Sequence, residues 1–211
     1  MTIHNNIEQG SEEWRTLRAG RVGGTSCAAL LTNGKSDNGL GVGAQAMVYR
    51  KAAEYITGPQ DDTYVNAAME RGTALEPVAR RRYENEYFCT VQEVGYISEG
   101  EYLGVSPDGL IGEDGGLEIK CPGADEFLRF FDTREMKKEY YQQVQWSLYI
   151  SGRKWWDFVY YHPEFAPMDL ICERFYPDPD MFAAWDEKVP IYCAEVARVL
   201  NKVEAGIAET E

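Results

Sequence analysis

The sequence is poor in the residues that define several common classes of protein. It has only two histidines, and its five cysteines are scattered without a Cys-x-x-Cys pair. Neither a zinc site nor a disulfide framework is therefore indicated. No run approaches the ~20 apolar residues of a membrane span, and the first residues lack the basic start and apolar stretch of an export signal. We therefore expect a protein of the cytoplasm that does not cross a membrane.

Positive charge is also scarce. The chain has 21 lysine and arginine residues against 35 aspartate and glutamate residues, a formal net charge of −14. Nucleic-acid binders are expected to gather lysine and arginine because phosphate contacts dominate their affinity. The bulk charge thus favours a small-molecule or protein partner, although residues 80–82 and 153–154 are candidates for a local positive surface. A phosphate-binding loop of the form G-x-x-x-x-G-K-[ST] is absent from the sequence.

Apolar residues are abundant enough for one compact domain. Of the 211 residues, 44% are hydrophobic and 13% aromatic, so residues 1–211 are expected to form a single domain with a sizeable core. The helix predicted at 178–204 would pack on that core or on a neighbouring subunit. By periodicity, helices are expected at 11–19, after residue 26, and at 46–56, 64–88, 124–138, 140–150 and 178–204, and strands at 91–105, 106–122, 155–161 and 168–176.

The residues that carry chemistry are concentrated in one segment, SPDGLIGEDGGLEIKCP at 106–122. Near its end the apolar Leu117 and Ile119 alternate with Glu118 and Lys120. On a strand, successive side chains point to opposite faces, so Leu117 and Ile119 would face the core. The carboxylate of Glu118 and the ammonium of Lys120 would then share the other face.

Turn sequences lie earlier in the same segment. Asp108 is followed by a glycine, and residues 113–116 read Glu-Asp-Gly-Gly, where glycine accepts a positive φ at little cost. The two halves are therefore expected to pair as a hairpin that brings Asp108 beside Glu118. Two ionised carboxylates repel, and a shared proton or a divalent cation relieves the repulsion. With Lys120 adjoining, a cation is the better interpretation, and Mg²⁺ suits an all-oxygen site that activates water for in-line attack.

The pattern at 107–108 and 118–120 resembles the PD-(D/E)XK signature of restriction-endonuclease-like nucleases. A surface hairpin with a salt bridge is the alternative. The flanking sequences SPDGL and GLEIKCP, together with the later QVQ, resemble in order and spacing the phage lambda exonuclease family of YqaJ-like viral recombinases. The resemblance covers residues 14–187. It implies an α/β fold with a restriction-endonuclease-like core, a mixed central β-sheet flanked by helices.

The resemblance assigns roles to five residues of the central region. Asp108, Glu118 and the backbone carbonyl of Ile119 are expected to bind the metal. Lys120 is expected to orient or deprotonate the attacking water and to offset charge in the transition state. Because the family places a glutamine of its Gln-x-Gln pair at the catalytic centre, Gln143 is expected to position water or phosphate there.

A third carboxylate is expected on the helix predicted for residues 64–88. In the family, a helical glutamate that follows a glycine by four residues completes the metal site, and Glu76 follows Gly72 in this way. Pro77 comes next. A proline inside the helix would bend it and orient Glu76, whereas a proline at the first position of a new helix is simply favourable.

A second polar cluster is expected near the N-terminus. Residues 23–26, GGTS, indicate a loop entering a helix, where free N–H groups and hydroxyls favour an anion; a plain helix N-cap is the alternative. The resemblance to the family's Trp-x-x-x-Arg and Thr-Ser stretches implies that Arg18, Ser26 and Ser106 hold the terminal phosphate of DNA. Lys35, in the loop at 32–44, is a further candidate DNA contact.

These assignments imply a Mg²⁺-dependent 5′ to 3′ exonuclease, with Mn²⁺ accepting similar oxygen ligands. It would digest one strand of linear double-stranded DNA from its 5′-phosphorylated end, release mononucleotides and leave a 3′ single strand for strand annealing. The resemblance also implies a homotrimeric ring, a single-strand annealing recombinase as partner, and a phage or prophage origin in a bacterial host. Alternatives are a distributive or endonucleolytic PD-(D/E)XK nuclease without 5′-phosphate dependence, an inactive DNA-binding scaffold, and a metal enzyme acting on small phosphorylated molecules.

Overall fold

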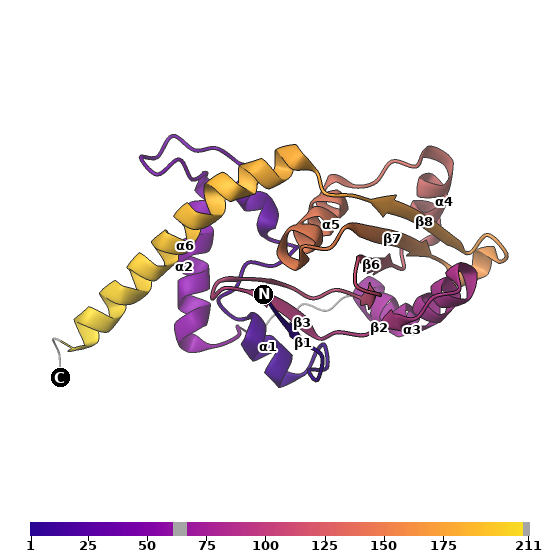
Figure 1. The fold of residues 1–211 in the computed structure, drawn as a ribbon, viewed down its shortest axis with the longest axis horizontal. Coiled ribbons are helices and arrows are strands. Elements are labelled where there is room, and N and C mark those ends of the chain that lie inside the picture. The colour runs from indigo at the N-terminus through magenta and orange to yellow at the C-terminus, as the bar shows by residue number, and fades with distance from the viewer. Residues whose placement is uncertain (61–66, 209–211) are drawn as a thin grey trace.

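The computed structural model describes residues 1–60 and 67–208, and this part of the chain contains a five-stranded sheet that lies toward the end of the molecule opposite the C-terminus (Figure 1). Neighbouring strands run antiparallel except β6 and β7, which are parallel. The sheet is therefore mixed, as expected from the sequence. Its order is β2 (Val91–Gln92), β5 (Gly109–Ile111), β6 (Gly115–Lys120), β7 (Trp155–Tyr161) and β8 (Leu170–Phe175).

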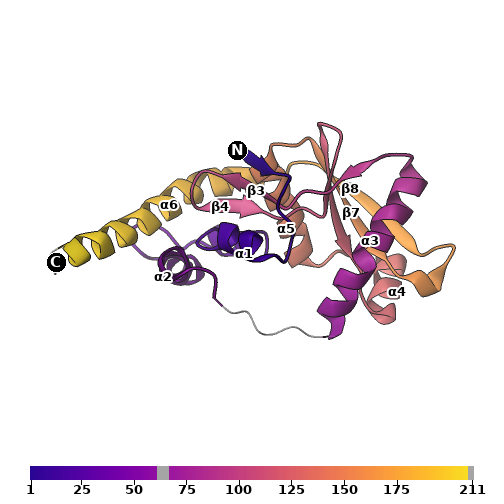
Figure 2. The same cartoon turned by 90° about the horizontal axis from the view of Figure 1, so that it is seen from below.

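A smaller antiparallel sheet lies beside it and involves the N-terminus. Its order is β1 (Thr2–His4), β3 (Tyr96–Glu99) and β4 (Leu103–Val105). Helix α1 (Glu12–Arg18) lies against this sheet (Figure 2), and the chain after it pairs Val22 with Leu103 of β4. Because β4 leads directly into Ser106 and Asp108, this sheet brings α1 to the central hairpin.

Helices cover both faces of the five-stranded sheet. On one face, Ala79 and Tyr83 of α3 (Ala67–Tyr87) pack with Leu117 and Ile119 of β6, which confirms the predicted core face of that strand. The other face lies under the helical crossover that joins the parallel strands β6 and β7, with Phe158 in its core. That crossover consists of α4 (Ala124–Thr133) and α5 (Lys138–Ser151).

Several predicted helices differ from the observed ones, including the helix predicted at 124–138, which ends at Thr133. The stretch after residue 26 forms only a five-residue 3₁₀ helix, η1 (Cys27–Leu31). Helix α2 (Val42–Thr57) begins four residues before the predicted start, because the extended backbone of Gly41 serves as its N-cap. Pro77 lies inside the continuous helix α3, so the interpretation of Pro77 as the first residue of a new helix is wrong.

The C-terminal helix α6 (Pro179–Ala208) packs on the core, one of the two arrangements expected for it. Trp185, Tyr192 and Val196 are buried in the cluster that also contains side chains of α2 and η1. Residues 201–206 are exposed, and the helix ends beyond α2 (Figure 1). A short 3₁₀ helix, η2 (Pro163–Phe165), lies between β7 and β8. None of the described helices has the length and apolar character needed to span a bilayer.

Candidate active site

The hairpin of β5 and β6 places Asp108 beside the end of β6. The N–H of Asp108 donates to the carbonyl of Leu117 at 3.2 Å, and its Oδ2 accepts the N–H of Ile119 at 2.6 Å. The next residue must be small: a Cβ on Gly109 would lie 2.1 Å from Cγ1 of Val91 on the adjoining strand. The backbone thus fixes the Asp108 carboxylate at the strand that carries Glu118, as predicted.

Glu118 is the buried centre of the site. Its side chain is 1% exposed, since α5 covers this face of the sheet. Oε1 accepts Nζ of Lys120 at 2.5 Å and Nε2 of Gln143 at 2.7 Å. Oε2 is buried and has no hydrogen-bond partner among the described residues. The structure therefore brings together three residues singled out from the sequence, two from β6 and one from α5.

Glu76 reaches the same region from α3. Its Oε1 accepts Nη2 of Arg80 at 2.6 Å. Burial, followed by the charge of Asp108, raises the pKa of Glu76 from 4.5 to about 7, while Arg80 and Lys120 oppose the shift. Arg80 also donates through Nε to the backbone carbonyl of Asp108 at 3.2 Å, so one guanidinium joins Glu76 to the start of the hairpin.

The protonation of the site follows from burial and crowding of charge. Burial raises the pKa of Glu118 to about 7; Lys120 opposes the rise and Asp108 adds to it. Burial also raises the pKa of Asp108. For Lys120, burial acts to lower the pKa, but the negative charges of Glu118 and Asp108 outweigh it and raise the pKa. Lys120 is therefore a cation in this arrangement and acts as a hydrogen-bond donor.

The carboxylates of Asp108, Glu118 and Glu76 accept hydrogen bonds from groups of the protein itself. In residues 1–60 and 67–208, no group of three or more His, Cys, Asp or Glu side chains is arranged to hold a metal ion. The chemistry of the set nevertheless fits a hard cation, because such ions take carboxylate and carbonyl oxygens. The buried, unpartnered Oε2 of Glu118 is an acceptor that a cation would satisfy. Asp108, Glu118 and Glu76 are the residues that could hold it.

Trp14 connects two of the three residues expected to bind phosphate. Its Nε1 donates to Oγ of Ser106 at 3.0 Å and to the carbonyl of Gly95 at 3.1 Å. The guanidinium of Arg18 lies over the Trp14 ring, 3.9 Å from its centroid. From the sequence alone, Trp14 has no assigned function. The signal was its spacing of four residues from Arg18, which makes the two neighbours on a helix.

The third residue of this group, Ser26, lies in a turn in which its hydroxyl hydrogen-bonds to Gly23. This turn touches the catalytic centre through Gly24, where a Cβ would lie 2.8 Å from Cγ of Gln143. The loop therefore lies directly against one of the predicted catalytic residues. Lys35 is exposed in the segment between η1 and α2.

Comparison with known proteins defines the family. Residues 13–154 match the family described as the YqaJ-like viral recombinase domain. The chain belongs to this family. The alkaline exonuclease LHK-Exo of Laribacter hongkongensis shares 33% sequence identity with it, at a TM-score of 0.79 over 95% of this chain and 100% of that one. That exonuclease also has a structure in complex with dAMP, with the same TM-score and identity.

A phage-related exonuclease from Haemophilus somnus 129PT has a TM-score of 0.67 and 16% identity, over 87% of this chain and 96% of that one, and shows the fold alone. No curated protein matches the chain. Membership in the YqaJ-like family and the likeness to LHK-Exo confirm the predicted family, the α/β restriction-endonuclease-like fold and the assignment to nuclease enzymes. The family is one of divalent-metal nucleases.

Residues of the basic clusters noted in the sequence make contacts within the protein. Arg80 contacts Glu76 and Glu93, and Arg82 contacts Glu86 and Asp169. At 153–154, the arginine donates to two backbone carbonyls and the lysine pairs with an aspartate. Arg80 and Arg82 are therefore each balanced by two carboxylates and contribute little to a local positive surface, whereas Lys154 stays 74% exposed in its pair with Asp114.

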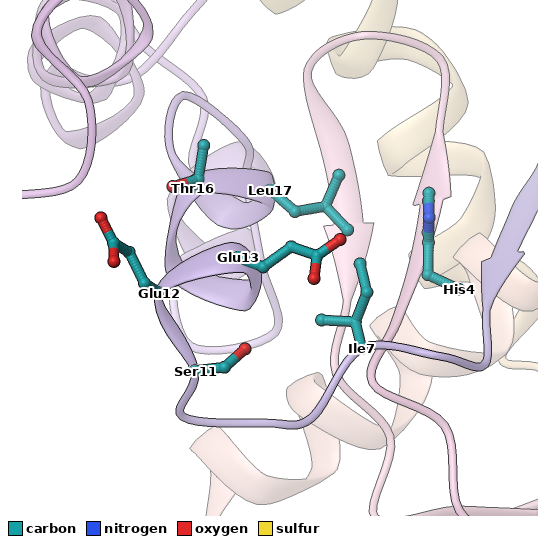
Figure 3. A pocket seen from close by; sticks show the side chains of 7 residues that line it. All are labelled: His4, Ile7, Ser11, Glu12, Glu13, Thr16 and Leu17. Atoms are coloured by element: carbon teal, nitrogen blue, oxygen red, sulfur yellow. The ribbon is translucent and has the colours of Figure 1, made fainter.

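A surface hollow of about 820 Å³ lies between α1 and the N-terminal strand (Figure 3). Ile7 and Leu17 supply apolar side chains, and the carboxylate of Glu13 projects between them. None of the residues predicted to bind the metal or the 5′-phosphate lines this hollow. Its lining residues are His4, Ile7, Ser11, Glu12, Glu13, Thr16 and Leu17.

Proposed function

We propose that the chain is a Mg²⁺-dependent 5′ to 3′ exonuclease that digests one strand of linear double-stranded DNA from a 5′-phosphorylated end. It releases mononucleotides and leaves a 3′ single strand for recombination by strand annealing. The observation that carries the proposal is the convergence of Lys120 and Gln143 on the buried Glu118, beside Asp108, in a member of a nuclease family. Mn²⁺ would serve in place of Mg²⁺, since it accepts the same oxygen ligands.

In this proposal Asp108, Glu118, Glu76 and the carbonyl of Ile119 hold the metal. A divalent cation held by these residues would supply Lewis-acid chemistry at the scissile phosphate and at a bound water. Lys120, held as a cation by its carboxylate neighbours, donates to the attacking water or to a phosphate oxygen and offsets the charge that develops there.

Gln143 acts on the same centre without adding charge. Its Nε2 donates to Oε1 of Glu118 at 2.7 Å, so the amide fixes the orientation of that carboxylate. The free lone pairs of its amide oxygen can then accept a hydrogen bond from a water. A neutral side chain suits this position, because a further anion would repel the phosphate and a further cation would compete with the metal.

The second part of the proposal is a pocket for the 5′-phosphate. Arg18 and Ser106, joined through Trp14, supply a fixed guanidinium and a hydroxyl, and Ser26 adds a second hydroxyl. Ser106 lies two residues before Asp108. A terminal phosphate bound at Ser106 would therefore determine which phosphodiester bond of the DNA lies beside Asp108 and Glu118. This connection supports 5′ to 3′ polarity. The dAMP complex of LHK-Exo supports a deoxynucleoside monophosphate as the product.

The proposal extends to assembly and setting by family resemblance. We expect a homotrimeric ring, a single-strand annealing recombinase that receives the 3′ strand, and action in the cytoplasm of the bacterial host of a phage or prophage. Lys35 remains a predicted DNA contact. Sedimentation of the chain with and without DNA measures the oligomeric state directly.

Digestion of three substrates tests the function: a linear duplex with 5′-phosphates, the same duplex with 5′-hydroxyls, and a closed circle, each with Mg²⁺ or EDTA. We expect mononucleotides from the phosphorylated ends only with Mg²⁺, and no cutting of the circle. Arg18→Ala should remove the preference for 5′-phosphate while retaining residual activity. Cleavage of the circle would instead establish an endonuclease, and silence on every substrate would refute the proposal.

A further inference from the structure

Arg80 is a buried arginine whose three guanidinium nitrogens all have acceptors. Nη2 donates to Oε1 of Glu76 at 2.6 Å, Nη1 pairs with Oε2 of Glu93 at 2.7 Å, and Nε donates to the carbonyl of Asp108 at 3.2 Å. Its side chain is only 10% exposed. The acceptors come from α3, from the segment between β2 and β3, and from the start of the central hairpin. One side chain therefore links three separate parts of the fold.

Two of these acceptors belong to residues of the proposed metal site. The apolar contacts of Ala79 and Tyr83 hold α3 against the sheet, but they do not determine where the carboxylate of Glu76 points. Glu76 has a flexible side chain that is 32% exposed, and without a partner it would sample several rotamers. The short contact to Arg80 selects one of these rotamers. Because Arg80 also donates to the Asp108 carbonyl, the position of the Glu76 carboxylate is fixed relative to the hairpin.

The geometry requires an arginine. A guanidinium is a rigid planar fork with donors in several directions, whereas a lysine ammonium is a point charge on a flexible stem. Lysine at this position would keep the positive charge next to Glu76. It would not contact Glu76, Glu93 and the Asp108 carbonyl in one fixed orientation.

We propose that Arg80 is a positioning residue for the metal site, which holds the carboxylate of Glu76 in register with Asp108 so that ligands from a helix and a hairpin meet at one cation. The inference rests on the proposed function, in which Glu76 and Asp108 are metal ligands. It adds to that site a residue that would act through its contacts with Glu76 and Asp108. Outer partners of ligands commonly change metal affinity or activity by about 10- to 100-fold when removed.

The test is Mn²⁺ binding to the full chain without DNA, measured by isothermal titration calorimetry, together with kcat and KM on a 5′-phosphorylated duplex. Arg80→Ala and Arg80→Lys should each weaken Mn²⁺ binding by about 10-fold or more and lower kcat, with little change in KM. Arg82→Ala is the matched control: it removes another Arg–Glu pair with i,i+4 spacing from the same helix, and should leave Mn²⁺ affinity unchanged.

An Arg80→Lys chain that binds Mn²⁺ as tightly as the original would overturn the proposal, because charge alone would then suffice. Thermal unfolding checks that the variants are folded. If Arg80→Ala is not folded, Glu93→Gln replaces it: Glu93 is 74% exposed, and its loss should weaken Mn²⁺ binding measurably by freeing one end of the guanidinium. Unchanged affinity in that variant counts against the inference. If the protein without substitutions binds Mn²⁺ but does not cleave DNA, the proposed function is refuted.

Discussion

Gly24→Ala is the substitution that most directly tests whether the N-terminal loop and the catalytic centre are in contact. The new Cβ would lie 2.8 Å from Cγ of Gln143, closer than two carbons can pack. The contacted atom is in the middle of the side chain, so Gln143 has to rotate as a whole. It would then lose the 2.7 Å hydrogen bond to Oε1 of Glu118.

The size of the effect follows from that hydrogen bond. A hydrogen bond to a charged group contributes ~1.5–3 kcal/mol. If it is made fully in the transition state, its loss lowers kcat by roughly 10- to 150-fold, at about 1.4 kcal/mol for each factor of ten. Glu118 would also become less well fixed, because Lys120 would be the remaining donor to Oε1.

The assay is kcat on a 5′-phosphorylated linear duplex, and the chain offers a matched control. A Cβ on the neighbouring Gly23 would have no atom within 4 Å, so Gly23→Ala should leave kcat unchanged. Combining Gly24→Ala with Gln143→Ala should give the kcat of Gln143→Ala alone, because both changes remove the same contact. A normal kcat in Gly24→Ala, or fully additive losses in the double variant, would refute the reasoning.

Three further predictions concern charge and stability. Lys120→Ala should lower kcat by orders of magnitude while Mn²⁺ and DNA still bind; a normal kcat would mean that the site is elsewhere. In EDTA, the free energy of unfolding should fall as pH rises from about 4.5 to about 7 and level off above that. Burial raises the pKa of Glu76 and of Glu118 from 4.5 to about 7 in the folded protein, so unfolding releases protons over this interval. Urea denaturation at several pH values measures this, and a stability that rises over that interval would contradict the pKa shifts. Tyr83→Phe should cost ~1.5–3 kcal/mol of stability, since it removes the 2.5 Å hydrogen bond to the buried Asp157; an unchanged urea midpoint would contradict it.

The central hairpin could be predicted from sequence because its signals are local. Alternation fixes which side chains of β6 share a face, and the glycines at 115–116 and the turn before them fix the reversal of the chain. Strand β7 has the predicted bounds, Trp155–Tyr161, for the same reason: an aromatic, β-prone run ends at a proline. Where a structural feature depends on residues close together in the sequence, sequence patterns are sufficient to predict it.

Pairing between distant segments could not be predicted in this way. The stretch at 91–105 alternates loosely, but it divides between two sheets, since β3 pairs with β1 at the N-terminus and β2 pairs with β5. The burial of Glu118 is similar: alternation shows its face, and only the packing of α5 closes that face to water. Both features depend on contacts between residues far apart in the chain.

The two glutamines of the Gln-x-Gln pair have the same side chain but different roles, because they lie on different sides of α5. Gln143 faces Glu118, whereas Gln145 is fully buried, donates to the carbonyl of Tyr176 and accepts the N–H of Asp178. Two positions on a helix differ by about 200° around its axis, so the side chains leave it in nearly opposite directions. Gln145 therefore joins α5 to the chain entering α6, and of the two glutamines Gln143 is the one that contacts Glu118 of β6.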